Sequence, residues 1–492
     1  MGIRAVGFVA LLAAAGCAVG PSTRVTPPPF QAARAPDSLT APAARAFLDS
    51  LTRVREREDT GARMLAPPHP LALDPASDQP WLDVLRDSQV VRLVQTAIAN
   101  NRDLQIAVAR VREYRALRGV ARADFFPQLS LNAQASENQS AFGDFPVQTY
   151  NVVRGTADLA WELDFWGRLR RQTEAASLDL KGREEDERAA VVSLVSDVVT
   201  AYLQLRELDQ ALAISEQTLE SRRATLALAR RRFAEGVISE LDVRQFEAEA
   251  AAPAARVADF ARQRSEREHQ LALLLGQPPG PILRGAPLEA VVQGVAVPDS
   301  IPAELLLRRP DVRRAERDFQ AATARVGLAL GNRLPKVMIV GQYGRQNQIF
   351  RGFFSDSNEI YTAQVGISVP LFTGGKLVDQ QRAARARADQ ARARYEQTVL
   401  SAFAEADDAL IGLRLGRDQL VAQQTQAQAL ARAYALAVQR YQNGVSSYLE
   451  VLDSQRSLYN AQLSLVTQER QYLGATVRLY KALGGSWNNS ER

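Results

Sequence analysis

The sequence repeats itself at a fixed offset of 208 residues, and this repeat is the feature that most constrains the fold. The stretch Arg232-Phe-Ala-Glu-Gly-Val-Ile-Ser-Glu-Leu-Asp242 returns as Arg440-Tyr-Gln-Asn-Gly-Val-Ser-Ser-Tyr-Leu-Glu450. The helix-stopping residues Pro127 and Pro335 are separated by the same distance. A constant offset over so long a stretch indicates an internal duplication. We therefore expect the second half of the chain to repeat the fold of the first.

The two matched stretches each predict a reversal between helices. Gly236 and Gly444 follow long helical runs, where glycine adopts without a Cβ clash the left-handed conformation that ends a helix. The residues that follow fit two helix-capping boxes, Ser239-x-x-Asp242 and Ser447-x-x-Glu450. Each stretch therefore ends one helix and begins the next, which gives a tight helical hairpin. Capping alone is a sufficient role for both carboxylates at this level.

Each half has the same predicted order: a helix, two strands, a long helix, a turn and a return helix. Residues 167–235 contain no proline, and a continuous helix of this length would extend roughly 100 Å, far more than a globular helix. The strands are expected at about 128–140 and 147–166, then at 336–348 and 360–372. The two turns are expected at about 233–242 and 441–453. This is a mainly α chain of two tandem repeats with a smaller β part.

The predicted strands alternate apolar and polar side chains. Leu159, Trp161 and Leu163 alternate with residues that include Asp158 and Glu162. Strict alternation indicates a strand with one apolar face, and charges on the other face fit a membrane barrel with a polar interior. A soluble antiparallel sheet is the alternative. Four strands cannot close a membrane barrel, since the smallest have about eight, so copies of the chain would have to share one in a closed ring.

The N-terminus predicts export and lipid attachment. Residues 1–16 have the features of a signal peptide, with Arg4 ahead of an apolar run too short to span a bilayer. Cys17, the only cysteine, follows Ala-Ala-Gly in the manner of a bacterial lipobox, which would make it the lipid-carrying N-terminus. An ordinary cleavage site with an incidental cysteine is the alternative. No later apolar run reaches about 18 residues, so no transmembrane helix is expected.

Composition shifts divide the chain into six segments. They are a signal peptide (1–16), a lipidated tether (17–80), a first repeat (81–276), a linker rich in Pro and Gly (277–302), a second repeat (303–484) and a tail (485–492). The net charge of +5 is small beside 60 basic and 55 acidic residues, whose interleaving does not favour nucleic-acid binding. The two histidines lack metal-ligand spacing, and no phosphate loop or nucleophile elbow is present. An enzyme is therefore not expected, nor any cofactor beyond lipid on Cys17.

An ordered set of motifs resembles the outer membrane factor family, the TolC- and NodT-type channel lipoproteins of tripartite efflux pumps. The motifs lie between about 81 and 484, and they include Trp161-Glu-Leu-Asp164-Phe-Trp-Gly167-Arg168, Arg308-Arg309-Pro310-Asp311, Pro370-Leu-Phe-Thr-Gly374-Gly375, Tyr441-Gln-Asn-Gly444 and Leu452-Asp453. Each motif is modest alone. Their order within a duplicated frame, behind a lipobox, makes the resemblance specific.

The resemblance implies a homotrimer in which three chains pool their strands into a twelve-stranded outer-membrane barrel. Their helices would form a long periplasmic barrel that passively conducts substrates. The implied partners are a periplasmic adaptor, an inner-membrane pump of the RND type and outer-membrane lipid. A channel for type I protein secretion is one alternative. A periplasmic coiled-coil adaptor or scaffold lipoprotein is another, although it would not explain the amphipathic strands.

The resemblance also assigns residues to the periplasmic tip. Family members carry acidic residues in the second-repeat tip that match Glu450 and Asp453, and Asp242 matches the acidic site of the first tip. Tyr441 matches a residue implicated in holding the tip closed. The resemblance thus implies that these four residues gate or line the pore. We further hypothesise that Glu450 and Asp453, which share a helix face, set cation selectivity. A basic residue that locks the tip in some members falls at Ser446, so that ionic latch is expected to be absent.

Overall fold

The computed structural model describes residues 87–140, 148–292 and 306–485. The signal peptide, Cys17, the tether, part of the linker and nearly all of the tail lie outside the described residues. The described residues contain both predicted hairpin turns and all four predicted strands.

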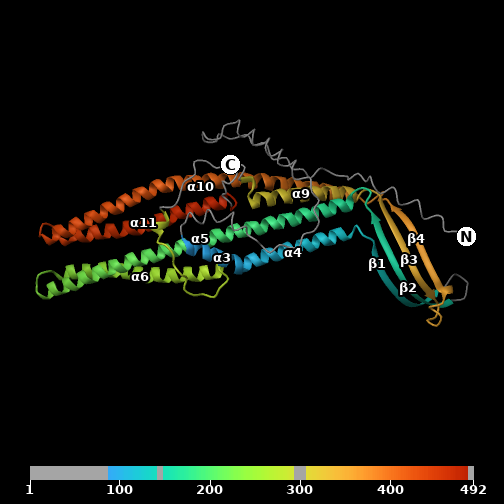
Figure 1. Ribbon diagram of the computed structural model, residues 1–492, viewed down its shortest axis with the longest axis horizontal. Helices are drawn as coiled ribbons and strands as arrows, with labels where there is room; N and C mark the ends of the chain where they lie inside the picture. Colours follow the sequence, from blue (N-terminus) through green and yellow to red (C-terminus); the bar gives the residue numbers. More distant parts are fainter. Residues whose placement is uncertain (1–86, 141–147, 293–305, 486–492) are drawn as a thin grey trace, which may run out of the picture. The chain divides into compact units, whose positions relative to one another are not determined.

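The expected order of elements is confirmed in both halves (Figure 1). The first half comprises α4 (Arg102–Ala123), β1 (Gln128–Ser140), β2 (Gln148–Leu163), α5 (Arg168–Ala234) and α6 (Glu240–Leu274). The second half comprises α9 (Pro310–Gly331), β3 (Lys336–Asn347), β4 (Glu359–Ser368), α10 (Lys376–Gln442) and α11 (Tyr448–Ala482). Three further elements are α3 (Ser88–Asn100), α7 (Leu288–Val292) and the short 3-10 turn η1 (Asp356–Asn358).

The helices of the two halves have equal lengths. Both α4 and α9 contain 22 residues. The long helices α5 and α10 contain 67 residues each, and the return helices α6 and α11 contain 35 each. An insertion in one copy would have broken this agreement, so the duplicated frame is intact through every described helix of the repeat.

Two strand ends differ by more than one residue from the sequence-based expectation. β4 ends at Ser368 rather than Phe372, because Pro370 has no amide hydrogen for a strand ladder. β2 ends at Leu163, where Asp164 leaves the strand to cap the next helix. Pro253 lies within α6 without ending the helix.

The chain forms two compact units, of which one comprises residues 109–185 and 313–397 and the other takes the remaining described residues. The first unit holds a four-stranded antiparallel sheet in the order β1-β2-β3-β4. Each strand pairs with its neighbours in the chain, and β1 and β4 each have only one partner strand. Within the described chain, the sheet therefore has two unpaired edges.

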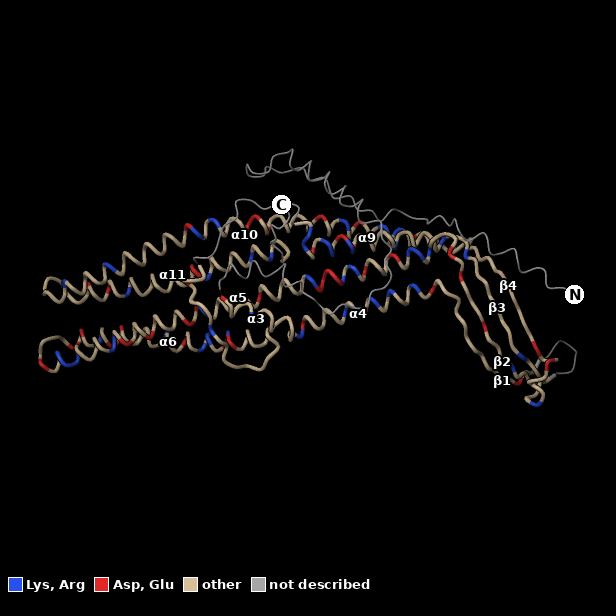
Figure 2. The backbone as a smooth tube through the Cα atoms, viewed as in Figure 1, with Lys and Arg blue, Asp and Glu red and all other residues tan. Residues whose placement is uncertain are grey.

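The two faces of this sheet differ in chemistry. The apolar face carries large side chains that are exposed, including Leu131 (84%), Val365 (66%) and Ile367 (69%). On the opposite face the Asp158 carboxylate accepts hydrogen bonds from Asn132 and from Gln342, which in turn accepts one from Arg154. Charged residues are sparse along the strands and dense along the helices (Figure 2). The predicted alternation thus gives the sheet one exposed apolar face and one polar face whose side chains are hydrogen-bonded to each other.

The junction between β2 and α5 is fixed by charged side chains. The Asp164 carboxylate accepts from the amides of Leu169 and Arg170 (3.0 Å each) and so caps α5. Glu162 accepts two hydrogen bonds from the Arg168 guanidinium (2.8 Å each). The Trp161 indole donates to the backbone carbonyl of Phe125 (2.9 Å). These contacts hold the strand at a defined angle to the helix that follows.

Glycines with positive φ form the turns that lead from the strands into α5 and α10. Gly167 precedes α5 with φ of 77°, and its repeat partner Gly375 precedes α10 with φ of 84°. Gly374, just before it, also has a positive φ of 59°. A side chain at any of these positions would be strained. The strand-to-helix motifs of the sequence, together with Pro370, therefore serve as structural joints.

The second unit is the helical core. One buried cluster joins α3, α5, α6, α7 and α11, and it includes Val198, Tyr202, Leu205, Leu271 and Leu473. Each such side chain contributes about 1.5–3 kcal/mol on burial. Within it the Tyr202 hydroxyl donates to buried Asp87 (2.9 Å) and accepts from the Gly285 amide (2.7 Å). Burial and the Asp87 charge raise the pKa of Tyr202 to about 12, so the donor stays protonated.

The duplication is also visible where each return helix ends. The Asn101 side chain donates to the Leu274 carbonyl at the end of α6 (2.9 Å). At the equivalent positions of the second half, Arg309 donates to the Ala482 carbonyl at the end of α11 (3.1 Å). Both contacts satisfy carbonyls that a helix end leaves free. Arg309, which belongs to the Arg-Arg-Pro-Asp motif, thus connects the start of α9 to the end of α11.

One described helix, α5, is long and apolar enough in one stretch to cross a membrane. More than half (56%) of that stretch is buried inside the protein, and α5 contributes residues such as Val195, Val198 and Leu205 to the buried cluster of the helical core. This burial is typical of a core helix, so the hydropathy of α5 is weak evidence for a transmembrane helix.

Candidate functional site at the helical tips

The two hairpin turns end their long helices with the same backbone motif. In the first hairpin the Val237 amide donates to the Arg232 carbonyl (2.8 Å), and the Gly236 amide donates to Phe233 (2.9 Å). This 6→1 and 5→2 pattern is a Schellman motif. The second hairpin reproduces both bonds 208 residues later, and Gly236 and Gly444 have φ of 74° and 73°. The expected left-handed glycines are thus observed in both turns.

The capping box of the first hairpin is present. The Asp242 amide donates to the Ser239 hydroxyl oxygen (3.3 Å), and the Ser239 amide donates to the Asp242 carboxylate (3.0 Å). The serine hydroxyl and amide, which both donate to the carboxylate, lower the pKa of Asp242. Asp242 therefore stays ionised as a local cap at the start of α6.

The capping box expected in the second hairpin is not formed, which corrects that prediction. Ser447 does occupy the N-cap position of α11, but its side chain makes no capping bond. The Glu450 carboxylate turns instead to the Arg440 guanidinium on the other arm of the hairpin (3.3 Å). Glu450 is one methylene longer than Asp242, which lets it cross the turn to a full charge.

The two tips contact each other through Arg232 and Tyr441. The Arg232 guanidinium donates to the Tyr441 hydroxyl (2.9 Å), so the first hairpin is bonded to the second. The Tyr441 ring packs edge-on against Tyr448 (5.1 Å), and Tyr448 packs against Phe246 of α6 (5.0 Å). Burial raises the pKa of Tyr448. We call Arg232, Tyr441, Tyr448 and Phe246 the tip cluster.

A ladder of polar contacts continues below the tip cluster, between α5 and α11. Ser215 bonds Tyr459 (2.9 Å), and Gln455 donates to Ser221 (3.2 Å). Nearer the core, Glu207 accepts from both Thr467 and Arg470, at 2.8 Å each. The two hairpins are therefore held together along their length, and the tip cluster is the outermost rung.

Asp453 lies one turn beyond Glu450 on α11. Its carboxylate pairs with the Arg456 guanidinium (2.6 Å), and the two side chains remain 65% and 61% exposed. Both acidic residues assigned to the second tip are therefore paired with an arginine of the same hairpin. The sequence had indicated an acidic tip, whereas the geometry gives a charge-balanced one.

Sequence reasoning missed the arginines and two aromatic residues of this site. Arg232 and Arg440 were recognised only as matched positions of the repeat, and Phe246 and Tyr448 were given no role. An arginine four residues before each turn glycine was the available signal, because a guanidinium at a helix end reaches across a short turn. The contact between Arg232 and Tyr441 joins different repeats, so no local pattern could have revealed it.

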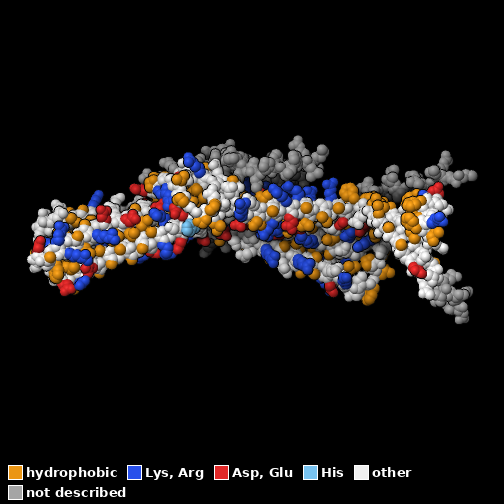
Figure 3. Space-filling view, turned by 90° about the horizontal axis from the view of Figure 1, so that it is seen from below, with side chains coloured by type: hydrophobic (Ala, Val, Ile, Leu, Met, Phe, Trp, Pro, Cys, Tyr) orange, Lys and Arg blue, Asp and Glu red, His pale blue; other side chains and the backbone are white. Residues whose placement is uncertain are grey.

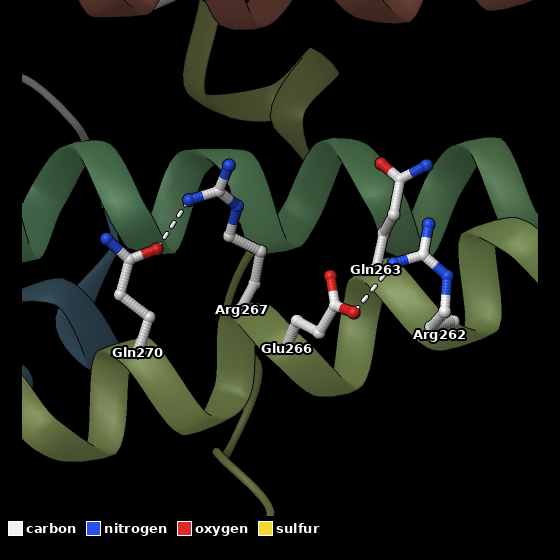
Figure 4. Close-up of a pocket in the computed structure, with 5 residues that line it drawn as sticks. All are labelled: Arg262, Gln263, Glu266, Arg267 and Gln270. Atoms are coloured by element: carbon white, nitrogen blue, oxygen red, sulfur yellow. Dashed lines mark hydrogen bonds and ion pairs between the residues drawn. The ribbon is translucent and has the colours of Figure 1, made fainter.

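Neither a hollow along α6 nor a metal-ligating cluster competes with the tips among the described residues. A depression of about 430 Å³ lies along α6 and is lined by Arg262, Gln263, Glu266, Arg267 and Gln270 (Figure 4). Its side chains bond mostly to their own helix neighbours, as Arg262 does to Glu266 (2.6 Å). No group of three metal-ligating side chains occurs within the described ranges. On the face shown in Figure 3, acidic and basic side chains are interleaved along the helices.

A sheet with an apolar outer face and free edges, joined to long helical hairpins with locked tips, defines one subunit of a channel-forming membrane protein. The chain belongs to the outer membrane efflux protein family, whose model matches residues 93–277 and 301–485. These ranges correspond to the two repeats. The resemblance to outer membrane factors is thereby confirmed, and the protein is an outer-membrane efflux channel protein.

Individual relatives agree with this assignment. The chain is 35% identical over 418 residues to the solvent efflux pump outer membrane protein SrpC of Pseudomonas putida, covering 83% of this chain and 88% of that protein. Among solved structures, CusC matches with a TM-score of 0.77 and 28% identity, covering 87% of this chain and all of that one. The outer-membrane channel OprN matches with a TM-score of 0.75 and 30% identity, covering 87% and 99%.

Proposed function

We propose that this chain is the exit duct of a tripartite efflux system and works as a homotrimer. The observation that carries the proposal is the sheet, with its exposed apolar face and two unpaired edges. Backbone groups at a sheet edge cannot remain unpaired in lipid, and four strands are too few to close a barrel. Three copies supply twelve strands, in which each β1 edge meets the β4 edge of the next copy.

The helices support the same assembly. α4 exposes Ile106, Leu117 and Val120, which lie on one side of the helix. α10 likewise exposes Leu400 and Ile411. Apolar stripes on long helices require partner helices. In a trimer, neighbouring copies cover these stripes and the helices close into a periplasmic tunnel.

The partners follow from the place of such a duct in the cell envelope. The chain receives substrate from a periplasmic adaptor and an inner-membrane pump of the RND type, and it conducts that substrate passively. Cys17 carries the lipid that adds an anchor to the barrel. An enzymatic activity and a bound cofactor are not part of this proposal.

The barrel is tested on the isolated outer membrane. A trimeric barrel migrates differently in gel electrophoresis before and after heating, and it stays in the membrane when Cys17 is changed to Ser. If the Cys17→Ser protein partitions as a water-soluble periplasmic rod, the barrel is wrong and a periplasmic scaffold is favoured. Co-purification of the cross-linked native complex separates efflux from type I protein secretion by identifying the inner-membrane partner.

The tip cluster is proposed as the gate, with Asp242, Glu450 and Asp453 at the pore mouth. Exposed ion pairs contribute about 0–1 kcal/mol to stability. The pairs of Glu450 with Arg440 and of Asp453 with Arg456 therefore affect chiefly the electrostatic potential at the tip. Glu450→Gln with Asp453→Asn removes two negative charges per chain and leaves both arginines. We expect single-channel recordings to show a shift towards anions. Unchanged ion preference would place these residues away from the pore.

A further inference from the structure

An aromatic cluster lies at the turn between β3 and β4. Phe350 stacks on Phe353 (6.2 Å between ring centroids, 1° between ring planes), and Phe354 meets Phe353 edge-on (5.2 Å). Phe350 and Phe354 are nevertheless 71% and 72% exposed. The rings contact one another and remain largely exposed. A cluster of large exposed apolar groups marks an interaction surface.

The contacts of Phe353 show which face of the sheet this cluster covers. Its ring lies 3.1 Å from the position that a Cβ on Gly155 would occupy. Gly155 points to the same face as Ala157, because alternate residues of a strand share a face. Ala157 pairs with Tyr343, which pairs with Tyr361. Phe353 therefore packs on the apolar face, beside two tyrosines and opposite the polar network of Asp158.

The distance to the other end of the sheet fits a bilayer. The strand from Gly155 to Leu163 spans about 26 Å at 3.3 Å per residue, or about 20 Å along the membrane normal at a tilt near 40°. Phe165 and Trp166, both exposed, follow just beyond it. Outer-membrane barrels carry an apolar band about 25 Å tall between two aromatic girdles. The phenylalanine loop stands where the outer girdle is required.

Charged groups lie at the same level of the sheet as Phe353, because Gly155 pairs with Arg345 in the strand ladder. Arg345 pairs with Asp356 in the same turn (3.2 Å) and lies opposite Glu359 in the ladder, one step beyond the paired tyrosines on the same face. The apolar face thus ends in tyrosines and then in an ion pair. A loop that closed the pore would instead have to lean over the polar face.

We propose that the loop Phe350–Phe354 is an interfacial anchor that inserts its rings into the headgroup region of the outer-membrane lipid. This inference rests on the proposed function, because it requires the sheet to lie in a membrane. Its partner is the lipid surrounding the barrel, which covers Phe350 and Phe354. In a trimer the anchor occurs three times around the rim.

Site-directed nitroxide labels test the anchor. In the full chain with Cys17→Ser, single cysteines replace Phe354, Ser357 or Val365, and the labelled protein is reconstituted into phosphatidylethanolamine–phosphatidylglycerol vesicles. Collision rates with oxygen report lipid, and those with a water-soluble nickel chelate report water. We expect the label at 354 to resemble that at 365, with oxygen favoured, and the label at 357 in the same turn to favour nickel.

The comparison separates failure of the anchor from failure of the channel. If the label at 365 collides mainly with oxygen while the label at 354 collides mainly with the nickel chelate, the loop faces water. The anchor is then overturned, although the sheet remains in the membrane. If 365 also favours nickel, the membrane sheet itself is wrong. A label at Ile349, also exposed, repeats the measurement without removing a phenylalanine.

Discussion

The bond between Arg232 and Tyr441 is expected to hold the tip closed, and Tyr441→Phe tests it. The substitution removes the hydroxyl that accepts a hydrogen bond from the Arg232 guanidinium (2.9 Å), and it keeps the ring that packs against Tyr448. A hydrogen bond of this kind contributes about 1 kcal/mol net. Three copies in a trimer that opens as a unit lose about 3 kcal/mol, which corresponds to roughly a hundredfold shift towards the open state.

The assay is single-channel conductance in planar bilayers, where the closed tip limits current. We expect Tyr441→Phe to raise the open fraction or the conductance, and Arg232→Gln to do the same from the other side of the bond. The double variant should add little, because both changes remove one interaction. An additive effect would mean that the two residues act through different contacts.

Tyr459→Phe is the matched control. It removes a hydroxyl that joins the same two hairpins, at 2.9 Å from Ser215, but it lies about 16 Å along α11 from Tyr448. It should lower stability by a similar amount and leave conductance unchanged. If Tyr441→Phe also left conductance unchanged, the tip cluster would be structural and the gate would lie elsewhere.

Three further predictions concern stability. Burial and the charge of Glu289 raise the pKa of Glu469 from 4.5 to about 7. The folded protein therefore binds this proton more tightly than the unfolded chain does. The contribution of Glu469 to the free energy of unfolding is fully present below pH 4.5 and is lost as the pH rises through 7. Glu469→Gln should therefore raise the free energy of unfolding at pH 8 by roughly 3 kcal/mol and leave it unchanged at pH 4, as melting midpoints at the two pH values would show. Tyr202→Phe leaves buried Asp87 and the Gly285 amide without their shared partner, and it should cost about 2–3 kcal/mol and speed hydrogen exchange at Gly285. Gly444→Ala should cost about 1 kcal/mol through its positive φ, whereas Gly119→Ala, equally open but in a regular helix, should be neutral or stabilising in the same melting assay.

The order of helices, strands and turns could be predicted because its signals are periodic patterns or single marker residues. The offset of 208 residues fixed the equivalence of the halves, and Gly236 and Gly444 located the turns without knowledge of the packing. Strand alternation gave the two faces, since side-chain direction follows position in a strand. These are local properties, which a sequence carries in full.

The partners of the site residues could not be predicted for the same reason. Whether Glu450 caps α11 or pairs with Arg440 depends on how the two arms of the hairpin place the guanidinium and on one extra methylene. The bond between Arg232 and Tyr441 joins residues 209 positions apart. The raised pKa of Glu469 likewise depends in part on the charge of Glu289, which lies on α7 in a different segment of the chain. Sequence patterns name the candidates, and tertiary packing selects their contacts.

The tips are where the duplication stops being symmetric. The long helices, the turn glycines and the Schellman bonds are the same in both halves, so a trimer would present six nearly equivalent hairpins. Asp242 remains a cap, whereas Glu450 turns to Arg440; Arg232 leaves its own hairpin to bond Tyr441. Each bond between hairpins therefore has one donor repeat and one acceptor repeat, and it occurs three times rather than six. A gate built on it would open with threefold symmetry, by separating unlike hairpins, while the sixfold frame of helices stays in place.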